Sequence, residues 1–340
     1  MEVESLHRLE SSGVEMIIAI DSTRAGPALG GCRWRPYPDS VSARREAIAL
    51  ARAMTRKAAL ARLALGGGKA VVSGDPKRRT REQLLRFGEF VQSLGGSYIT
   101  AADMGTGAAE MTVIAETTSH VVGLPRERGG CGDPAPYTAE GVQLAIEAAL
   151  RRTGRTVEGA IVAIQGVGQV GRALVDRLVA AGAQVIAADP QPAALETLPT
   201  GVRLVAPEQI TTEACEVFAP CGPAGAIDAQ VADALDCRIV CGAANNPLAA
   251  LAIGRRLAAR GILYVPDFLA NAGGLIHLAV ALEGGDDAAT TRRLRVIPEN
   301  LDRVLAYAES SGVDPALSAE RIATALARGE PEPDLDSGAA

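Results

Sequence analysis

The sequence predicts an α/β protein of two domains, and three observations support that prediction. The chain has 340 residues, enough for two domains that each bury a core. Short apolar runs alternate with stretches of helical periodicity, which is typical of a parallel sheet covered by helices. A loop rich in glycine and proline at residues 126–136 separates two such regions, and we place the domain boundary near Pro134–Tyr137.

The first region, residues 1–135, is predicted to be an α/β domain. Four apolar runs predict its strands, at residues 16–23, 69–74, 97–103 and 120–124. Apolar residues at helical spacing predict two helices, at residues 41–63 and 81–94. Two amphipathic helices are predicted much later in the chain, at residues 297–310 and 318–328, and we expect the segment 285–328 to pack back on this domain.

The second region, residues 136–284, has a strand–helix–strand order. Its first helix is expected to begin at Thr138, a residue type that caps helix N-termini. Residues 271–283 predict a long helix, and the tail at 329–340 lacks the apolar residues of a core, so we expect it to be disordered. Six apolar runs predict strands, at residues 160–165, 184–190, 203–207, 216–222, 236–247 and 263–268.

Composition argues against several classes of function. The formal net charge of −6 argues against nucleic acid or an anionic membrane as the main partner. No apolar run reaches the roughly 18 residues that a membrane span needs. The six cysteines form no Cys-x-x-Cys pair and the three histidines show no metal-ligand spacing, so we expect reduced thiols and no metal site. The N-terminus lacks the apolar core of a signal peptide, and we therefore expect a cytoplasmic protein.

The sextet "GVGQVG" at residues 166–171 is the first candidate binding site. It lies between an apolar strand and an amphipathic helix, and the next strand ends in Asp189, 23 residues after Gly166. This context predicts a Rossmann domain, in which the turn holds a pyrophosphate and the acid binds ribose hydroxyls. The alternative is a glycine turn that only packs a helix on a strand. The residues assigned to the cofactor here are Gly166, Gly168, Gln169, Val170, Gly171 and Asp189.

The acid at the end of the second strand also suggests which dinucleotide binds. A carboxylate at residue 189 would repel a 2′-phosphate, and the "PQPAA" that follows supplies no Arg or Lys. We therefore expect NAD rather than NADP.

Two lysines and one aspartate are candidates for chemistry. Lys57 shares a helical stripe with Leu50 and Met54, so it either extends its ammonium to solvent or points it into a cleft to bind a carboxylate. Lys69 follows three glycines at the predicted start of a strand, where it is either a solvated charge or a general acid/base. Asp103 ends a strand, where it either caps the next helix or serves a site at the carboxyl edge of a sheet.

Eight motifs in order give the chain a family resemblance. They are "GPALGGCRW", "MTRKAALARLALGGGKAVVSGDP", "YITAADMGT", "GDPAPYTAEGV", "GVGQVG", "FAPCG", "CGAANNPL" and "PDFLANAGGLIHL". Together they resemble the amino-acid dehydrogenases of the leucine/phenylalanine/valine/glutamate group, and most closely the branched-chain and phenylalanine branch. The resemblance covers residues 14–325. It implies two domains with an active-site cleft between them, and NAD-dependent oxidative deamination of an L-amino acid to the 2-oxo acid plus ammonia.

The resemblance also implies roles for individual residues. Lys57 would bind the substrate carboxylate, assisted by the backbone of Gly30 and Gly31. Lys69 would activate water against the imine, and Asp103 would exchange a proton with the amino group. The residues that would hold the substrate amine or position the nicotinamide and its ribose are Asn271, Thr138, Ala243 and Asn245.

The side-chain pocket is expected to be apolar, with Leu29, Ala101, Leu275 and Leu278 in it. Because none of these residues could pair with a γ-carboxylate, glutamate is disfavoured and a branched or linear aliphatic amino acid is favoured. Phenylalanine and an unusual biosynthetic amino acid stay open, as does a catalytically silent NAD-binding regulator. The resemblance further implies a homo-oligomer whose only other partners are its small-molecule substrates.

Overall fold

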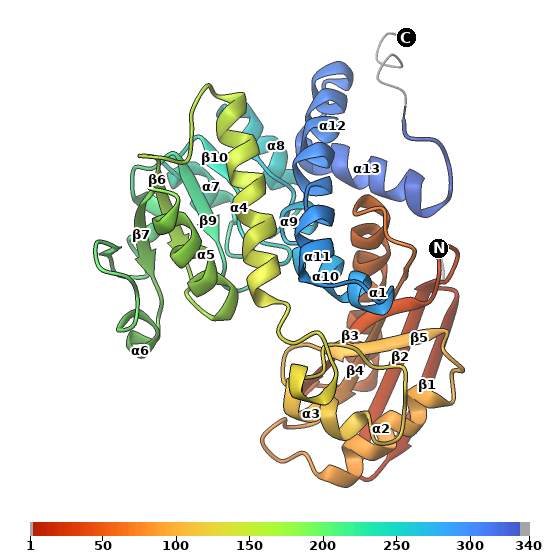
Figure 1. Cartoon of the computed structure of the whole chain (residues 1–340). Coiled ribbons are helices and arrows are strands. Elements are labelled where there is room, and N and C mark those ends of the chain that lie inside the picture. The colour runs from red at the N-terminus through yellow and green to blue at the C-terminus, as the bar shows by residue number, and fades with distance from the viewer. Residues whose placement is uncertain (1–2, 334–340) are drawn as a thin grey trace. The chain divides into compact units, whose positions relative to one another are not determined.

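The computed structural model describes residues 3–333, which form two compact units (Figure 1). Unit 1 comprises residues 3–134, 277–286 and 326–330, and unit 2 comprises residues 135–276, 287–325 and 331–333. Both units combine a sheet with helices, so the predicted two-domain α/β class is confirmed. Residues 334–340 of the predicted disordered tail lie outside the described residues.

Unit 1 contains a mixed sheet of five strands in the order β1-β2-β4-β3-β5. The strands β3, β4 and β5 are parallel to one another, whereas β2 is antiparallel to both β1 and β4. The bounds are β1 (Ser5–Ser11), β2 (Val14–Ser22), β3 (Ala28–Arg35), β4 (Gly66–Ser73) and β5 (Tyr98–Ala102). The sequence did not predict β1 or β3. The run predicted as a strand at residues 120–124 forms only an isolated bridge from Val121 to Thr100.

Helices cover both faces of this sheet. The helix α1 (Ser40–Leu60) packs on β2 and β4, while α2 (Arg81–Gln92) and α3 (Ala108–Ile114) contact β5. A short 3-10 helix, η1 (Arg126–Arg128), precedes the boundary between the units. The larger core contains Trp34, Phe87 and Tyr98. A smaller core under α1 consists of Ile17, Ala19, Ala43, Ala47, Ala51 and Val71.

Small side chains allow α1 to lie close to the sheet. Asp39 begins the helix by accepting a hydrogen bond of 2.6 Å from the Ser42 amide. Its buried face is mainly alanine, and a Cβ on Gly67 of β4 would lie only 2.0 Å from the Thr55 backbone nitrogen. Lys57 is half-buried in the last turn, beside this alanine face rather than at its centre.

Unit 2 contains a parallel sheet of six strands in the order β11-β10-β9-β6-β7-β8. The bounds of the strands are β6 (Ile161–Gln165), β7 (Gln184–Ala188), β8 (Arg203–Leu204), β9 (Val217–Pro220), β10 (Ile239–Val240) and β11 (Leu263–Tyr264). Apolar strands buried by helices are the expected pattern of a doubly wound α/β sheet.

The helices of the second half of the chain include two that the sequence predicted less accurately. The first, α4, begins at Ala135, so Thr138 lies inside its first turn and is not the N-cap. The segment predicted as a helix from residue 271 forms α10 from Gly273. The bounds are α4 (Ala135–Arg152), α5 (Gln169–Ala180), α6 (Pro192–Leu195), η2 (Ile210–Thr212), α7 (Ala229–Ala234), α8 (Ala252–Ala259), α9 (Asp267–Ala270), α10 (Gly273–Leu282), α11 (Asp287–Arg293), α12 (Val296–Ser311) and α13 (Pro315–Ala327).

The C-terminal helices belong with unit 2, which differs from the expected division at residue 284. Residues 287–325 group with unit 2, where α12 packs against α4 and α9. Burial gives the physical reason, since the apolar side of α12, with Leu301 and Val304, is fully covered there. Among the described residues, no helix is long and apolar enough to cross a membrane.

Candidate functional site

Lys69 and Asp103 form an ion pair on the face of the unit 1 sheet that α1 covers. Side chains alternate along a strand, so Gly67, Lys69 and Val71 share this face of β4. The Lys69 side chain is only 8% exposed and that of Asp103 is 22% exposed. The strand predicted from residue 69 begins at Gly66, three residues earlier than expected. Lys69 is thus a buried residue within β4 rather than a charge at its end.

Two cations hold the Asp103 carboxylate in its charged form. Lys69 Nζ contacts its Oδ2 atom, and Arg33 Nε lies 3.1 Å from the same oxygen. Burial by itself favours the neutral acid, but Lys69 and Arg33 together hold the pKa of the Asp103 carboxyl well below its usual range. The alternative role of Asp103 as a helix cap is not observed, because the N-cap of α3 is Gly107.

Missing side chains on β3 make room for this pair. A Cβ on Gly31 would lie 2.8 Å from the Asp103 Cβ, and one on Gly30 would lie 1.7 Å from the Gly68 carbonyl oxygen. The pairing of β3 with β4 is also interrupted at these two glycines, whereas both pair with β5. The glycines that the sequence marks as candidate substrate contacts thus lie directly beside the Lys69–Asp103 pair.

Arg33 links the Lys69–Asp103 pair to two further charged residues, Glu46 and Arg35. Arg33 Nη1 lies 2.6 Å from Glu46 Oε1 on α1, and Arg35 Nη2 lies 2.5 Å from the other Glu46 oxygen. The Arg35 guanidinium in turn lies over the Tyr37 ring, 4.7 Å from its centroid. Arg33 was not among the predicted site residues, although its position two residues after Gly31 puts it on the same face of β3.

The loop that follows Asp103 is fastened at several points. The Thr106 hydroxyl bonds the Cys32 carbonyl at 2.8 Å and accepts from the Asp103 amide at 3.0 Å, and the Trp34 amide donates to the Met104 carbonyl at 2.8 Å. These bonds tie the loop to β3, so the position of the Asp103 carboxylate is set by backbone contacts as well as by its ion pairs.

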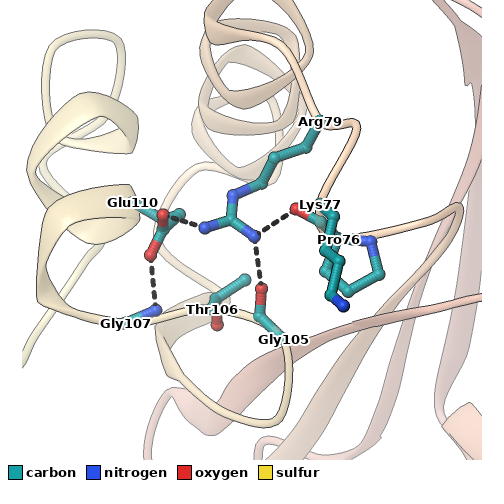
Figure 2. A pocket seen from close by; sticks show the side chains of 7 residues that line it. All are labelled: Pro76, Lys77, Arg79, Gly105, Thr106, Gly107 and Glu110. Atoms are coloured by element: carbon teal, nitrogen blue, oxygen red, sulfur yellow. Dashed lines mark hydrogen bonds and ion pairs between the residues drawn. The ribbon is translucent and has the colours of Figure 1, made fainter.

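Residues 105–107 of this loop line a shallow pocket of about 680 Å³, together with Lys77, Arg79 and Glu110 among others. Figure 2 shows the side chains that line it. The Arg79 guanidinium donates to the Pro76 carbonyl at 2.6 Å and to the Gly105 carbonyl at 3.0 Å, and it pairs with Glu110. Glu110 also accepts a hydrogen bond from the Gly107 amide at 2.8 Å. Arg79 thereby joins the segment after β4 to the loop after β5.

Two of the predicted pocket residues lie on the same face as the ion pair. Leu29 pairs in register with Gly67 and Ala101 with Gly31, and both side chains are buried. Leu278 also belongs to unit 1, where its side chain would lie 3.7 Å from a Cβ on Gly123. Leu275 is buried but belongs to unit 2.

The sextet at residues 166–171 forms a turn between β6 and α5. Gly166 has φ +94°, which glycine adopts without strain, and a Cβ on Gly171 would lie 2.1 Å from the Gly166 oxygen. A Cβ on Gly168 would meet no atom within 4 Å. The first and third glycines are therefore needed by the fold itself, whereas the second leaves open space at the N-terminus of α5. This geometry fits a pyrophosphate.

Asp189 lies directly after β7 and supports the turn. Its Oδ2 atom accepts a hydrogen bond of 2.8 Å from the Val167 amide, and Oδ1 accepts one of 2.8 Å from the Gln191 amide. A carboxylate has about four acceptor positions, so these two bonds leave capacity for ribose hydroxyls.

The remaining predicted residues of unit 2 meet around Asn271. Its Nδ2 atom donates to the Ala243 carbonyl at 3.1 Å and to Asn245 Oδ1 at 2.9 Å. Thr138 lies near Gly273, two residues after Asn271, because a Cβ on Gly273 would lie 3.1 Å from the Thr138 Cα atom. Asn271 is 5% exposed, and its Oδ1 atom has no hydrogen-bond partner among the described residues. A buried acceptor without a donor is costly, so this oxygen is suited to a ligand N–H.

No cluster of three metal-ligating side chains occurs in the part of the chain that the structure describes.

Residues 6–120 match the family described as "Glu/Leu/Phe/Val dehydrogenase, dimerisation domain", and residues 129–197 and 191–324 match "Glutamate/Leucine/Phenylalanine/Valine dehydrogenase". The chain belongs to this family. It is an amino-acid dehydrogenase, an oxidoreductase of a family that catalyses oxidative deamination and whose members depend on NAD(P).

Individual relatives align with this amino-acid dehydrogenase over nearly its whole length. The chain is 40% identical over 321 residues to valine dehydrogenase of Streptomyces albus, covering 92% of this chain and 88% of that protein. It is 38% identical over 319 residues to leucine dehydrogenase of Bacillus subtilis, covering 92% of this chain and 88% of that protein. The crystal structure of L-tryptophan dehydrogenase from Nostoc punctiforme superposes with a TM-score of 0.83 at 33% identity, covering 96% of each chain.

Proposed function

We propose that this dehydrogenase converts an apolar, aliphatic L-amino acid, water and NAD⁺ into the 2-oxo acid, ammonium and NADH, and that it also runs in reverse. The observation that carries the proposal is the buried Lys69–Asp103 pair beside the apolar residues Leu29 and Ala101. The family accounts for the type of reaction. The side chain of the substrate, the choice of NAD and the role of each residue are the proposal.

In unit 1, Lys69 and Asp103 manage the protons of the reaction. Once the substrate has been oxidised to an imine, Lys69 takes a proton from water so that the oxygen can attack the imine carbon. The resulting carbinolamine loses ammonia when its nitrogen is protonated, and Asp103 exchanges the proton with that nitrogen. Lys57, half-buried at the end of α1, binds the substrate carboxylate together with the backbone of Gly30 and Gly31.

In unit 2, the residues around the glycine turn hold the dinucleotide. When bound, NAD⁺ supplies a hydride acceptor for the substrate α-carbon. The turn from Gly166 to Gly171 accommodates the pyrophosphate, and Asp189 binds the ribose hydroxyls while its negative charge disfavours the 2′-phosphate of NADP. Thr138, Ala243 and Asn245 position the nicotinamide and its ribose.

Asn271 orients a donor group of the ligands. Its Nδ2 atom is already used by Ala243 and Asn245, so the amide is fixed with Oδ1 as the unoccupied acceptor. We assign this oxygen to the substrate amino group, which is the donor that must be held while the α-carbon is oxidised. The nicotinamide carboxamide is the other N–H donor that it could serve, and for this reason Asn271 counts among the cofactor contacts too.

The side-chain preference follows from the apolar residues Leu29, Ala101, Leu275 and Leu278. None of them could pair with a γ-carboxylate, which disfavours glutamate, and Leu278, in unit 1 with Leu29 and Ala101, would narrow a space otherwise suited to an aromatic ring. Valine and leucine dehydrogenases among the relatives support an aliphatic substrate. A single methylene changes selectivity by only about 1–3 kcal/mol, so closely related aliphatic substrates are expected to share turnover.

A panel of 2-oxo acids tests the proposal directly. The purified chain is mixed with ammonium, NADH or NADPH and each of the 2-oxo acids of valine, leucine, isoleucine, norvaline, phenylalanine, tryptophan and glutamate, and loss of absorbance of the reduced nucleotide is followed. We expect the highest kcat/KM with a branched or linear aliphatic oxo acid and NADH. A preference for an aromatic acid would overturn the aliphatic assignment. Binding of NADH without any turnover would instead favour a catalytically silent regulator.

The assembly and location of the protein are part of the same proposal. The description of the first family match as a dimerisation domain supports a homo-oligomer, which light scattering of the purified chain would test. Five cysteines form no disulfide among the described residues, which supports a reducing, cytoplasmic environment; they are Cys32, Cys215, Cys221, Cys237 and Cys241.

A further inference from the structure

We infer that Arg33 is a positioning residue for the reaction, because it holds the Asp103 carboxylate in place as a permanent counter-ion, with Glu46 fixing its guanidinium. The inference deepens the proposed function and rests on it, since it concerns how Asp103 is kept ready to exchange protons. Three features of the geometry support it.

The first feature is the shared oxygen. Lys69 Nζ and Arg33 Nε both contact Asp103 Oδ2, and neither of these ion pairs uses Oδ1. Arg33 lies on β3, between β4, which carries Lys69, and β5, which precedes Asp103. The Asp103 carboxylate is therefore bound by cations from two neighbouring strands. With Oδ2 fixed by two cations, the orientation of Oδ1 is fixed as well, and Oδ1 is the oxygen that can exchange a proton with the substrate nitrogen.

The second feature is that Arg33 is itself fixed by a separate group. Its Nε atom serves Asp103 while its Nη1 atom lies 2.6 Å from Glu46 Oε1, so one planar fork spans two carboxylates. Glu46 is held on its other side by Arg35 at 2.5 Å. The exposed fraction of the side chain is 17% for Arg33, 20% for Glu46 and 46% for Arg35. The Arg33–Glu46 pair, which is nearer to Asp103, is therefore better shielded from water than the Arg35–Glu46 pair.

The third feature is the charge balance during turnover. Lys69 is the partner that must gain and lose a proton, and each time it becomes neutral Asp103 loses one of its two cations. Arginine does not deprotonate in proteins, so Arg33 keeps the buried carboxylate paired through that step. Two other titratable groups near Asp103, Cys32 on β3 and Tyr98 on β5, lie on the opposite face of the sheet, and burial raises the pKa of both, so they stay neutral.

The test compares Arg33→Gln with Arg35→Gln in the full-length protein. Arg35 is the matched control, because it lies on the same strand and pairs with the same Glu46 but does not contact Asp103. General acid–base groups contribute roughly 10²–10⁴-fold, and we expect Arg33→Gln to lower kcat about 10- to 100-fold with a smaller change in KM. Arg35→Gln should change kcat less than about threefold, as expected for a half-exposed pair.

A pH profile separates positioning from a structural effect. Loss of Arg33 removes a cation that favours ionised Asp103, so the carboxyl pKa rises and the acid limb of kcat moves to higher pH in Arg33→Gln. In an Asp103→Asn background the same substitution should have no further effect on kcat. A lower kcat with an unshifted acid limb, or an undiminished effect in the Asp103→Asn background, would overturn the inference.

A second variant and an NMR titration test the positioning role if Arg33→Gln does not fold or if activity alone is ambiguous. If Arg33→Gln fails to fold by thermal melting, Arg33→Lys replaces it, and this variant should restore the acid limb but not the full kcat, because an ammonium cannot reach both carboxylates as the fork does. A ¹³C NMR titration of the Asp103 carboxyl, assigned by its loss in Asp103→Asn, reports on the pairing without turnover. If the unaltered protein turns over none of the oxo acids, the proposed function fails, while an unshifted Asp103 titration in Arg33→Gln, or full kcat in Arg33→Lys, refutes the positioning role alone.

Discussion

The Lys69–Asp103 site and the glycine-rich turn differ in what occupies the space at their centres. In unit 1 the space is filled by charged side chains, and glycines such as Gly31 are present so that Asp103 can fit. In unit 2 the backbone itself forms the site, and Gly168 leaves open space where a side chain would otherwise stand. The comparison suggests that the first site depends on the identity of a few side chains, whereas the second depends on the absence of side chains.

The largest effect is expected from Lys69→Ala. The variant removes the proposed acid/base, and Arg33 remains to pair with Asp103, so the chain should still fold. We expect kcat to fall at least about 10³-fold, within the range for general acid–base groups. Affinity for NADH, measured by fluorescence titration, should not change.

The control for this variant is Lys77→Ala, since Lys77 is exposed on the same unit. It should leave kcat unaltered. Full activity of Lys69→Ala would contradict the role of Lys69, and lost NADH affinity would show that the two sites are not built as separately as the comparison suggests.

A medium effect is expected from Gly168→Ala. An added methyl would meet no protein atom within 4 Å, so the melting temperature should stay the same. A pyrophosphate bound there would be displaced, and we expect the NADH Kd to rise about tenfold or more, which corresponds to about 1.4 kcal/mol.

The matched variant is Gly171→Ala. Its methyl would lie 2.1 Å from the Gly166 oxygen, and it should therefore lower the melting temperature as well as NADH affinity. Unchanged NADH binding in Gly168→Ala would mean that the open space is not where the cofactor lies.

The smallest effect is expected from Asp189→Ser. The substitution removes the charge that repels a 2′-phosphate, and the ratio of kcat/KM for NADH over NADPH should fall by about tenfold, again about 1.4 kcal/mol. Asp189→Asn keeps the shape of the side chain, so a similar fall in that variant would attribute the preference to charge rather than to the bonds with Val167 and Gln191. An unaltered ratio in both variants would show that another residue reads the ribose.

The sequence predicted the fold around the glycine-rich turn of unit 2 well because the signals there are local. The turn at residues 166–171, the strand before it and the helix after it are adjacent in the chain, and β6 and α5 lie where the motif placed them. Asp189 was singled out in the same way, from its place at the end of the next predicted strand, and it lies directly after β7.

The strands of unit 1 were harder to predict because the sequences of two of them lack the usual strand pattern. β3 contains "ALGGCRWR", and its paired glycines suppress the apolar alternation that marks a strand. The same effect hid the first three residues of β4, which are all glycine. These glycines are tolerated because close approach of neighbouring backbones, and not side-chain packing, determines that part of the sheet.

The role of Arg33 could not be predicted from its neighbours in sequence. Its two carboxylate partners lie 13 and 70 positions away, and only the register of β3 against β5 and the packing of α1 bring them together. An arginine next to a tryptophan in a run without a recognised strand gives no sign of a buried contact. Recognising β3 would have supplied one, because Leu29, Gly31 and Arg33 then fall on one face.

The central place of β3 in its sheet limits how this chain can change its length. Parallel ladders hold the strand on both edges, and a single inserted residue between Gly31 and Arg33 would turn every later side chain to the opposite face. The guanidinium would then point into the apolar core that includes Phe87 and Tyr98, Trp34 would leave that core, and Asp103 would face Lys69 alone. Insertions and deletions in descendants or engineered versions of the protein should therefore accumulate in surface loops and be absent from residues 28–35.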